Sequence, residues 1–63
     1  MNCEKLIELR TAKGMTQKEL AEHVGVSHVM ISYYENGWKE PSISVLRRIT
    51  EVLGCTSDAL IRK

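Results

Sequence analysis

The segment from His28 to Asn36 carries side chains that could bind another surface. At helical spacing, one side of it presents donors, acceptors, an aromatic ring and an aliphatic group, on His28, Val29, Ser32, Tyr33 and Asn36. None of these five positions holds Lys, Arg, Asp or Glu, whereas an ordinary solvated helix face more often does. Such a face suits recognition by hydrogen bonds and apolar contacts rather than by net charge.

The sequence holds no arrangement typical of a catalytic or metal centre. Cys3 and Cys55 lie far apart, and they form no metal-ligand spacing with His23 or His28. No nucleophile–base pair and no phosphate-binding glycine loop is present in the sequence. We therefore expect no enzyme, no cofactor and no metal.

Length and composition bound the class of protein. With 63 residues, the chain 1–63 is expected to be a single small domain. Its 43% hydrophobic and 27% charged residues are typical of a folded globular protein. The net charge is only +1, so an argument for a nucleic-acid partner must come from the placement of charges. No apolar run approaches the ~18 residues of a membrane span, and two cysteines are few for a disulfide scaffold, so we expect a cytoplasmic protein.

Four glycines divide the chain into segments of helical periodicity. A glycine in the left-handed conformation commonly ends a helix, and the candidates are Gly14, Gly25, Gly37 and Gly54. The clearest start signal is the capping box from Thr16 to Glu19; the other predicted caps are Ser27, Ser42 and Thr56. The sequence therefore predicts an all-α fold of five helices, at 3–13, 17–24, 28–36, 43–53 and 57–62.

Apolar residues spaced by three and four mark the face of each helix that we expect to be buried. They are Leu6, Leu9, Leu20, Ala21, Val24, Ile31, Tyr34, Leu46, Ile49, Leu53 and Leu60. Leu60 and Ile61 are neighbours in a short helix, so both cannot point into one small core. We expect one of the two to be left for a partner.

Residues 17–36 form a helix, a short turn and a second helix, and a wider set of residues shares a known pattern. The set is Leu9-Arg10, Gly14-Met15-Thr16-Gln17, Glu19-Leu20-Ala21, Gly25-Val26-Ser27, Ile31-Ser32, Glu35-Asn36-Gly37, Pro41-Ser42 and Leu53-Gly54. With these residues the chain resembles the helix-turn-helix domain of the lambda-repressor/Cro-like (XRE) family, from about residue 6 to residue 60. The resemblance implies a compact five-helix domain that binds a DNA operator sequence-specifically. It further implies a transcriptional regulator, expected to be a repressor of phage or prokaryotic type.

The resemblance places helix 28–36 in the major groove, with its N-terminal part toward the base edges. The implied base readers are His28, Val29, Ser32 and Tyr33. The implied phosphate contacts are Gln17, Ser27, Asn36, Trp38 and Lys39. Tyr33 departs from the long polar or basic residue common at its position in the family. Without an arginine or glutamine reader, modest specificity or reliance on DNA shape would follow.

Structural alternatives exist for several of these side chains. His28 and Lys39 could be ordinary exposed residues, Tyr33 could pack on a neighbouring helix, and Trp38 could cover the core without touching DNA. The family often pairs the positions of Arg10 and Glu35, which would tie the first helix to the third. Cys55 stands where the family has a small aliphatic residue, so we interpret it as a buried hydrophobic residue.

One recognition helix with four small readers covers few base pairs. We therefore expect a homodimer, at least on DNA, that reads two half-sites about 34–36 Å apart in a palindromic or near-palindromic operator. The surface expected to form the dimer contact lies around residues 55–61. A function of another class stays open: a protein-interaction module of the same fold, such as an antitoxin that holds a toxin, which the near-neutral charge would also suit.

Overall fold

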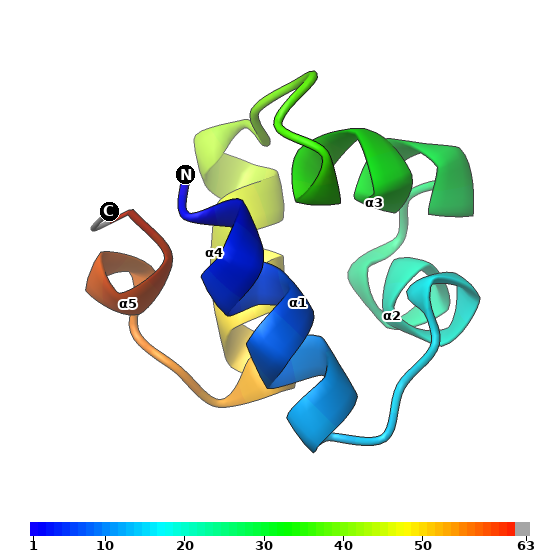
Figure 1. Ribbon diagram of the computed structural model, residues 1–63, viewed down its shortest axis with the longest axis horizontal. Coiled ribbons are helices and arrows are strands. Elements are labelled where there is room, and N and C mark those ends of the chain that lie inside the picture. The colour runs from blue at the N-terminus through cyan, green and yellow to red at the C-terminus, as the bar shows by residue number, and fades with distance from the viewer. Residues whose placement is uncertain (62–63) are drawn as a thin grey trace.

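The computed structural model describes residues 1–61, and these residues form five helices (Figure 1). They are α1 (Cys3–Ala12), α2 (Gln17–Val24), α3 (His28–Glu35), α4 (Ile43–Leu53) and α5 (Ser57–Ile61). Residues 1–61 contain no strand, and the all-α class is confirmed. α1 and α3 end one residue earlier than predicted, because Lys13 and Asn36 are their C-caps. The predicted end of the last helix, at position 62, lies outside the described residues.

The predicted capping residues determine where the helices begin. Thr16 and Glu19 form the capping box, in which each side chain accepts the backbone N–H of the other residue at 3.1 Å. Ser27, Ser42 and Thr56 each accept a backbone N–H three residues further along, at the starts of α3, α4 and α5. These bonds satisfy donors that a helix leaves without an internal partner.

The turn between α2 and α3 depends on Gly25. Its φ of 87° lies in the left-handed region, which a residue with a side chain rarely adopts. A Cβ at this position would make only an ordinary van der Waals contact, at 3.5 Å, with the guanidinium of Arg48, so the backbone conformation and not a lack of space favours glycine. The same guanidinium donates a hydrogen bond to the carbonyl of Val24 at 3.5 Å, so α4 holds the end of α2 from outside the turn.

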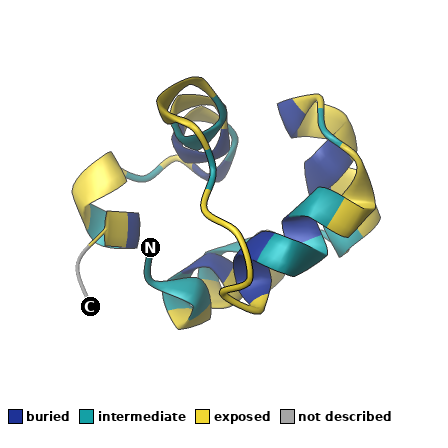
Figure 2. Ribbon diagram, turned by 90° about the horizontal axis from the view of Figure 1, so that it is seen from above, coloured by how far each residue is buried: buried dark blue, intermediate teal, exposed yellow. Residues whose placement is uncertain are grey.

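The core draws side chains from all five helices. Its buried hydrophobic members are Leu6, Leu20, Ala21, Val24, Ile31, Tyr34, Ile49, Leu53 and Leu60. Figure 2 shows these buried stretches in dark blue on the sides of the helices that face one another. Every one of them belongs to the predicted core. Leu9 and Leu46 were expected there too, but they are only half-buried because they pack against its edge.

One face of α3 packs into the core, and the other face is turned toward solvent. Ile31 and Tyr34 are buried, with exposed fractions of 0% and 3%. In Figure 1, α3 lies at the edge of the molecule beside α2, and the segment after it loops outward before α4 begins. Figure 2 shows most of that connecting segment in yellow, as exposed. The fold thus leaves one side of α3 and the segment behind it accessible to a ligand.

Candidate nucleic-acid interface

The predicted readers lie on the outer side of α3. His28 and Val29 are exposed, while Ser32 and Tyr33 are half-buried. We call these four residues the reader face. Because the core takes Ile31 and Tyr34 from the opposite side of α3, the predicted division of this helix into two faces is confirmed.

The reader face ends in a small polar contact at the C-terminus of α3. The side-chain amide of Asn36 donates to the Ser32 carbonyl at 2.8 Å and to the Ser32 hydroxyl at 3.3 Å. These bonds satisfy a carbonyl in the last turn of the helix. They also fix the side chains of Ser32 and Asn36 relative to each other.

Tyr33, Trp38 and Lys39 come together in what we call the aromatic cluster. The rings of Tyr33 and Trp38 have centroids 5.8 Å apart and planes tilted by 31°. The Lys39 ammonium lies 5.4 Å from the centre of the Tyr33 ring, within the range of a cation–π contact. The Tyr33 carbonyl accepts the backbone N–H groups of Trp38 at 2.9 Å and Lys39 at 3.4 Å. Side chains and backbone together hold the segment after α3 against the end of the helix.

The aromatic cluster bears on two of the structural alternatives. Trp38 is 74% exposed, so it does not cover the core. Tyr33 packs on Trp38, in the segment that follows its own helix. Together the three side chains line a small notch of about 170 Å³ that opens to solvent.

An acidic residue stands beside the aromatic cluster. Glu40 follows Lys39 directly and would repel a phosphate. Its carboxylate forms an ion pair with the α-ammonium of Met1 at 2.9 Å. This cation opposes the charge of Glu40 and reduces its repulsion of an anion nearby.

A second cluster, the polar cluster, consists of Arg10, Gln17 and Glu35. Arg10 Nε lies 2.6 Å from Glu35 Oε2, and Arg10 Nη2 donates to Glu35 Oε1 at 3.2 Å. Gln17 Nε2 donates to the same Oε1 at 2.9 Å. Arg10 Nη1 completes the cluster with a bond to the Met15 carbonyl at 2.7 Å. The expected pairing of Arg10 with Glu35 is confirmed, and the pair joins α1 to α3.

The bond between Gln17 and Glu35 was not foreseen. It places the side chain of Gln17, the first residue of α2, against the last residue of α3. One signal for this bond was present in the sequence: Glu35 directly follows the predicted core residue Tyr34. A carboxylate so close to the core needs hydrogen-bond donors from other parts of the chain. Gln17 and Ser27 stand at or just before the N-termini of α2 and α3, where backbone N–H groups and the helix dipole favour an anion.

The cysteines and histidines gather no metal site. Within residues 1–61, no three His, Cys, Asp or Glu side chains are grouped as metal ligands. Cys55 follows α4 and packs against the core, but it is half-buried and not fully buried as predicted. Burial raises the pKa of its thiol, while a backbone hydrogen bond and the charge of Lys5 act in the opposite direction. None of the described helices is long and apolar enough to cross a membrane.

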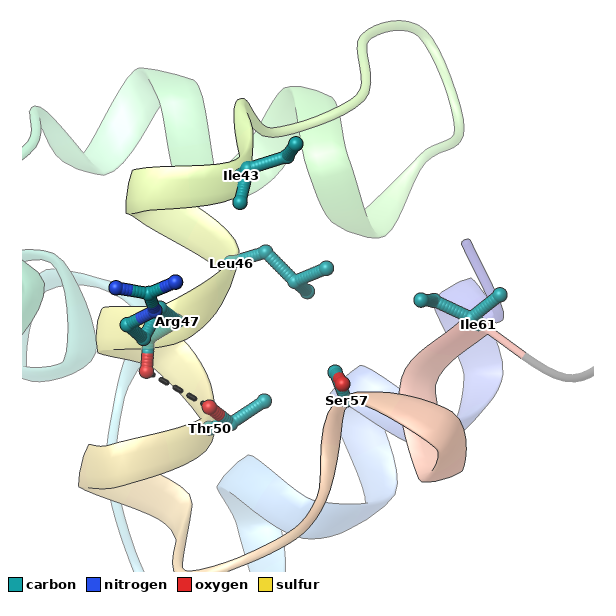
Figure 3. A pocket seen from close by; sticks show the side chains of 6 residues that line it. All are labelled: Ile43, Leu46, Arg47, Thr50, Ser57 and Ile61. Atoms are coloured by element: carbon teal, nitrogen blue, oxygen red, sulfur yellow. Dashed lines mark hydrogen bonds between the residues drawn. The ribbon is translucent and has the colours of Figure 1, made fainter.

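Side chains of α4 and α5 line a groove between the two helices (Figure 3). We call it the α4–α5 groove; its volume is about 250 Å³ and its lining residues are Ile43, Leu46, Arg47, Thr50, Ser57 and Ile61. Ile43 is 79% and Ile61 54% exposed. Leu60 is completely buried, so the prediction that only one residue of the Leu60–Ile61 pair enters the core is confirmed.

Comparisons with known proteins agree with this geometry. A family model described as helix-turn-helix matches residues 6–60. The HTH-type transcriptional activator BcrR of Enterococcus faecalis is 41% identical over 58 residues, which are 92% of this chain and 28% of BcrR. The SPbeta prophage-derived HTH-type transcriptional regulator YonR of Bacillus subtilis (strain 168) is 32% identical over 59 residues, which are 94% of this chain and 55% of YonR. The chain thus spans about a quarter of one relative and about half of the other.

A solved structure carries the same fold. The P22 c2 repressor, in a crystal structure with a synthetic operator, superposes with a TM-score of 0.92 at 32% identity, covering 95% of this chain and 91% of that one. The five-helix fold therefore has a counterpart in a repressor. The chain belongs to the helix-turn-helix family of the XRE type, a family of DNA-binding transcriptional regulators and not of enzymes.

Proposed function

We propose that this chain is the DNA-binding domain of a transcriptional repressor and that it reads the major groove with α3. The observation that carries the proposal is the reader face. It is accessible, it holds no Lys, Arg, Asp or Glu, and it lies opposite the core side of α3. Further support comes from the P22 c2 repressor, a similar fold that was solved with an operator.

The base contacts follow from the chemistry of the four readers. The exposed aliphatic group of Val29 suits the methyl group of thymine. A ring N–H of His28 can donate to N7 or O6 of guanine, and the Ser32 hydroxyl can bond to several bases. Tyr33 contributes a hydroxyl at the border of the reader face. These readers predict modest sequence specificity, because none of them makes the bidentate contacts of arginine or glutamine.

The proposed phosphate contacts flank the reader face. Gln17 and Ser27 would hold one stretch of backbone at the N-termini of α2 and α3. The contacts beyond the end of α3 would come from Asn36, Trp38 and Lys39. Such contacts fix the register of the domain on the duplex without selecting a base.

Selection of bound sequences from random duplex DNA tests this function, followed by titration of the selected duplex at several salt concentrations. We expect an enriched sequence, and an association constant that falls with salt with a slope of about −0.9 per phosphate contact. Val29→Ala should weaken the selected duplex more than random duplex, while the exposed control Glu51→Gln on α4 should leave both unchanged. Failure to enrich any sequence, or binding insensitive to salt, would reject the proposal and favour a protein partner.

We further propose that two copies bind a palindromic operator and meet through the α4–α5 groove. The groove offers exposed Ile43 and Ile61 beside the half-buried Leu46, and a two-fold axis would bring the same patch of both copies together. The patch is small, so DNA should supply part of the assembly energy. Sedimentation with a palindromic duplex should show two copies per duplex, and Ile61→Asp should lose the pairing.

The matched control for the assembly experiment is Ile7→Asp. Ile7 is another exposed isoleucine, on α1, and it lies outside the groove. It should pair like the unchanged chain. A strict one-to-one complex on a palindromic site at saturating protein would contradict the dimer.

Repression is the proposed direction of regulation, although the relative BcrR is named an activator. Both directions require DNA. We also propose a cytoplasmic location, because two cysteines are few for a disulfide scaffold and suit a reducing compartment. A reporter whose promoter overlaps the selected sequence should lose expression when the protein is supplied. Increased expression would reverse the proposed direction while leaving DNA binding intact.

A further inference from the structure

Within residues 1–61, Glu35 is the one buried carboxylate. Its side chain is 4% exposed, and it ends α3, the helix that carries the reader face. An apolar pair of similar volume often stabilises a fold as well as a buried ion pair does. Stability alone therefore does not account for a carboxylate at this position. The side chain that gains a second role from it is Gln17.

The carboxylate of Glu35 determines which way the side-chain amide of Gln17 faces. A carboxylate only accepts hydrogen bonds, so the amide must present its nitrogen, and Gln17 Nε2 donates to Glu35 Oε1 at 2.9 Å. This nitrogen carries two hydrogens, and the bond to Glu35 uses one of them. Gln17 is only half-buried, and the bond leaves its second N–H for another acceptor.

Glu35 can orient Gln17 because Arg10 holds Glu35 in place. Arg10 Nε lies 2.6 Å from Glu35 Oε2, and Arg10 Nη2 donates to Oε1 at 3.2 Å. The same guanidinium donates from Nη1 to the carbonyl of Met15, two residues before Gln17, at 2.7 Å. The start of α2 is thus held twice, through its preceding backbone and through the side chain of its first residue.

Such an arrangement prepares Gln17 for a ligand. A flexible side chain loses rotamer freedom when it binds, and that loss lowers the affinity. A glutamine that is already held by Glu35 has lost this freedom on folding. Because Gln17 begins α2 and Glu35 ends α3, their bond also fixes the start of α2 relative to the reader helix.

We propose that Glu35 is a positioning residue for operator binding, which holds the Gln17 amide so that its second N–H meets a DNA phosphate in register with the reader face. The inference rests on the proposed function, which gives the phosphate contact to Gln17. It adds a role for a buried residue that acts through Gln17 without touching DNA. Arg10 contributes by holding Glu35.

Two double variants with the same net charge separate this role from stability. Arg10→Met with Glu35→Leu removes the acceptor for Gln17, whereas Arg10→Met with Glu35→Gln replaces it with an amide oxygen. Both variants lose the ion pair and the bond to Met15, so they differ in what they offer to Gln17. Urea unfolding identifies conditions in which each variant is folded, and affinity for the selected duplex is measured there.

The deciding quantity is the loss of affinity that Gln17→Ala causes in each background. In the unchanged chain and in the Glu35→Gln background it should be about fivefold, as for a single hydrogen bond. In the Glu35→Leu background it should fall to about twofold or less, because a free glutamine must first lose its rotamer freedom. A merely structural role of Glu35 predicts the same loss in all three backgrounds, and that result would overturn the inference.

Nuclear magnetic resonance of the unchanged chain gives a readout that needs no folded double variant. Gln17 is the one glutamine of the sequence, and its side-chain amide signals are identified by their absence in Gln17→Ala. Nitrogen relaxation should show restricted motion of this amide already without DNA. Addition of the duplex should shift the amide proton that is not bonded to Glu35 more than the other. A freely moving amide in the DNA-free protein would contradict the positioning role.

The failures of the inference and of the proposed function are distinguishable. If the unchanged chain binds its duplex but Gln17→Ala loses the same affinity in every background, the inference is overturned and the proposed function stands. Equal binding by Gln17→Ala and the unchanged chain would also overturn the inference, with DNA binding intact. If the unchanged chain binds no duplex, the proposed function fails and the inference fails with it.

Discussion

The polar cluster and the aromatic cluster both attach to the C-terminal turn of α3, yet they have opposite surroundings. The Glu35 side chain is 4% exposed and the Arg10 side chain 14%. Trp38, three residues after Glu35, is 74% exposed. Within the described part of the chain, no buried side-chain nitrogen or oxygen lacks a hydrogen-bond partner.

The polar cluster stabilises the fold, whereas the aromatic cluster remains accessible to a ligand. A buried carboxylate destabilises the fold unless hydrogen-bond donors surround it. Arg10 and Gln17 supply these donors to Glu35. The polar cluster thereby joins α1, α2 and α3. The aromatic cluster joins only a helix to the segment that follows it, and most of the Trp38 surface remains in water. We expect changes in the first cluster to alter stability and changes in the second to alter binding.

Arg10→Met should have the largest effect. It removes the cation beside Glu35 and leaves a buried carboxylate with too few donors, which typically costs about 3–5 kcal/mol. That loss is a large part of the stability of a domain of this size. Urea unfolding followed by circular dichroism measures the loss.

Two variants serve as controls for this loss. Arg10→Met combined with Glu35→Leu removes both charges and should recover much of the stability, because an apolar pair can replace a buried ion pair. Trp38→Ala should change stability by no more than about 0.5 kcal/mol, as surface substitutions usually do. If Arg10→Met cost as little as Trp38→Ala, the contrast between the clusters would be lost.

The double change Ser32→Ala and Tyr33→Ala should have the second largest effect. It should lower the affinity for DNA and leave the stability of the fold unchanged. Neither residue lies in the core, so we expect the unfolding midpoint to stay close to that of the unchanged chain. Operator affinity should fall about tenfold or more, because two residues of the reader face are removed. Early melting of the double variant would show that the two faces of α3 are wrongly assigned.

Gln17→Ala tests a residue that belongs to the polar cluster and is also a proposed phosphate contact. Its effect on DNA affinity should be smaller than that of the double change. Loss of one phosphate contact should weaken all duplexes by a similar factor, about fivefold for a single hydrogen bond. The Arg10–Glu35 pair remains, so only a modest loss of stability should accompany it. Glu22→Gln, an exposed change on the same helix, is the control. A changed sequence preference at unchanged affinity would contradict the phosphate role.

Local chemistry explains why so much of the fold is predictable from the sequence. The capping box at Thr16 needs only residues close in the chain, as does the left-handed turn at Gly25. Spacing by three and four likewise identifies the buried side of α3, and hence the reader face on its other side.

The two clusters are less predictable, because they depend on the positions that separate elements take in space. The Arg10–Glu35 pair followed from a family resemblance and not from spacing alone. The bond from Gln17 to Glu35 joins residues 18 positions apart and requires the packed arrangement of α2 and α3. The exposure of Trp38 depends on the course of the segment before α4, which no helical period describes. The half-buried state of Leu9 and Leu46 likewise reflects the edge of a small core.

Cys55 should give the smallest effect, and it sharpens the comparison by testing the partial burial of a side chain outside both clusters. Its half-buried thiol favours the neutral form, so burial raises its pKa in the folded state. Below the ordinary thiol pKa of about 8.5, both states keep the proton and the contribution to stability is fully present. As the pH rises further, the unfolded chain loses the proton first, and the contribution is lost as the pH passes through the folded pKa. The free energy of unfolding, measured at about pH 7, 8.5 and 10, should therefore fall more steeply above about pH 8.5 in the unchanged chain than in Cys55→Ala. Other titrating groups are the same in both proteins, so their contribution drops out when the free energy of unfolding of Cys55→Ala is subtracted from that of the unchanged chain. If this difference in free energy stayed constant from about pH 7 to 10, it would contradict the burial of this thiol.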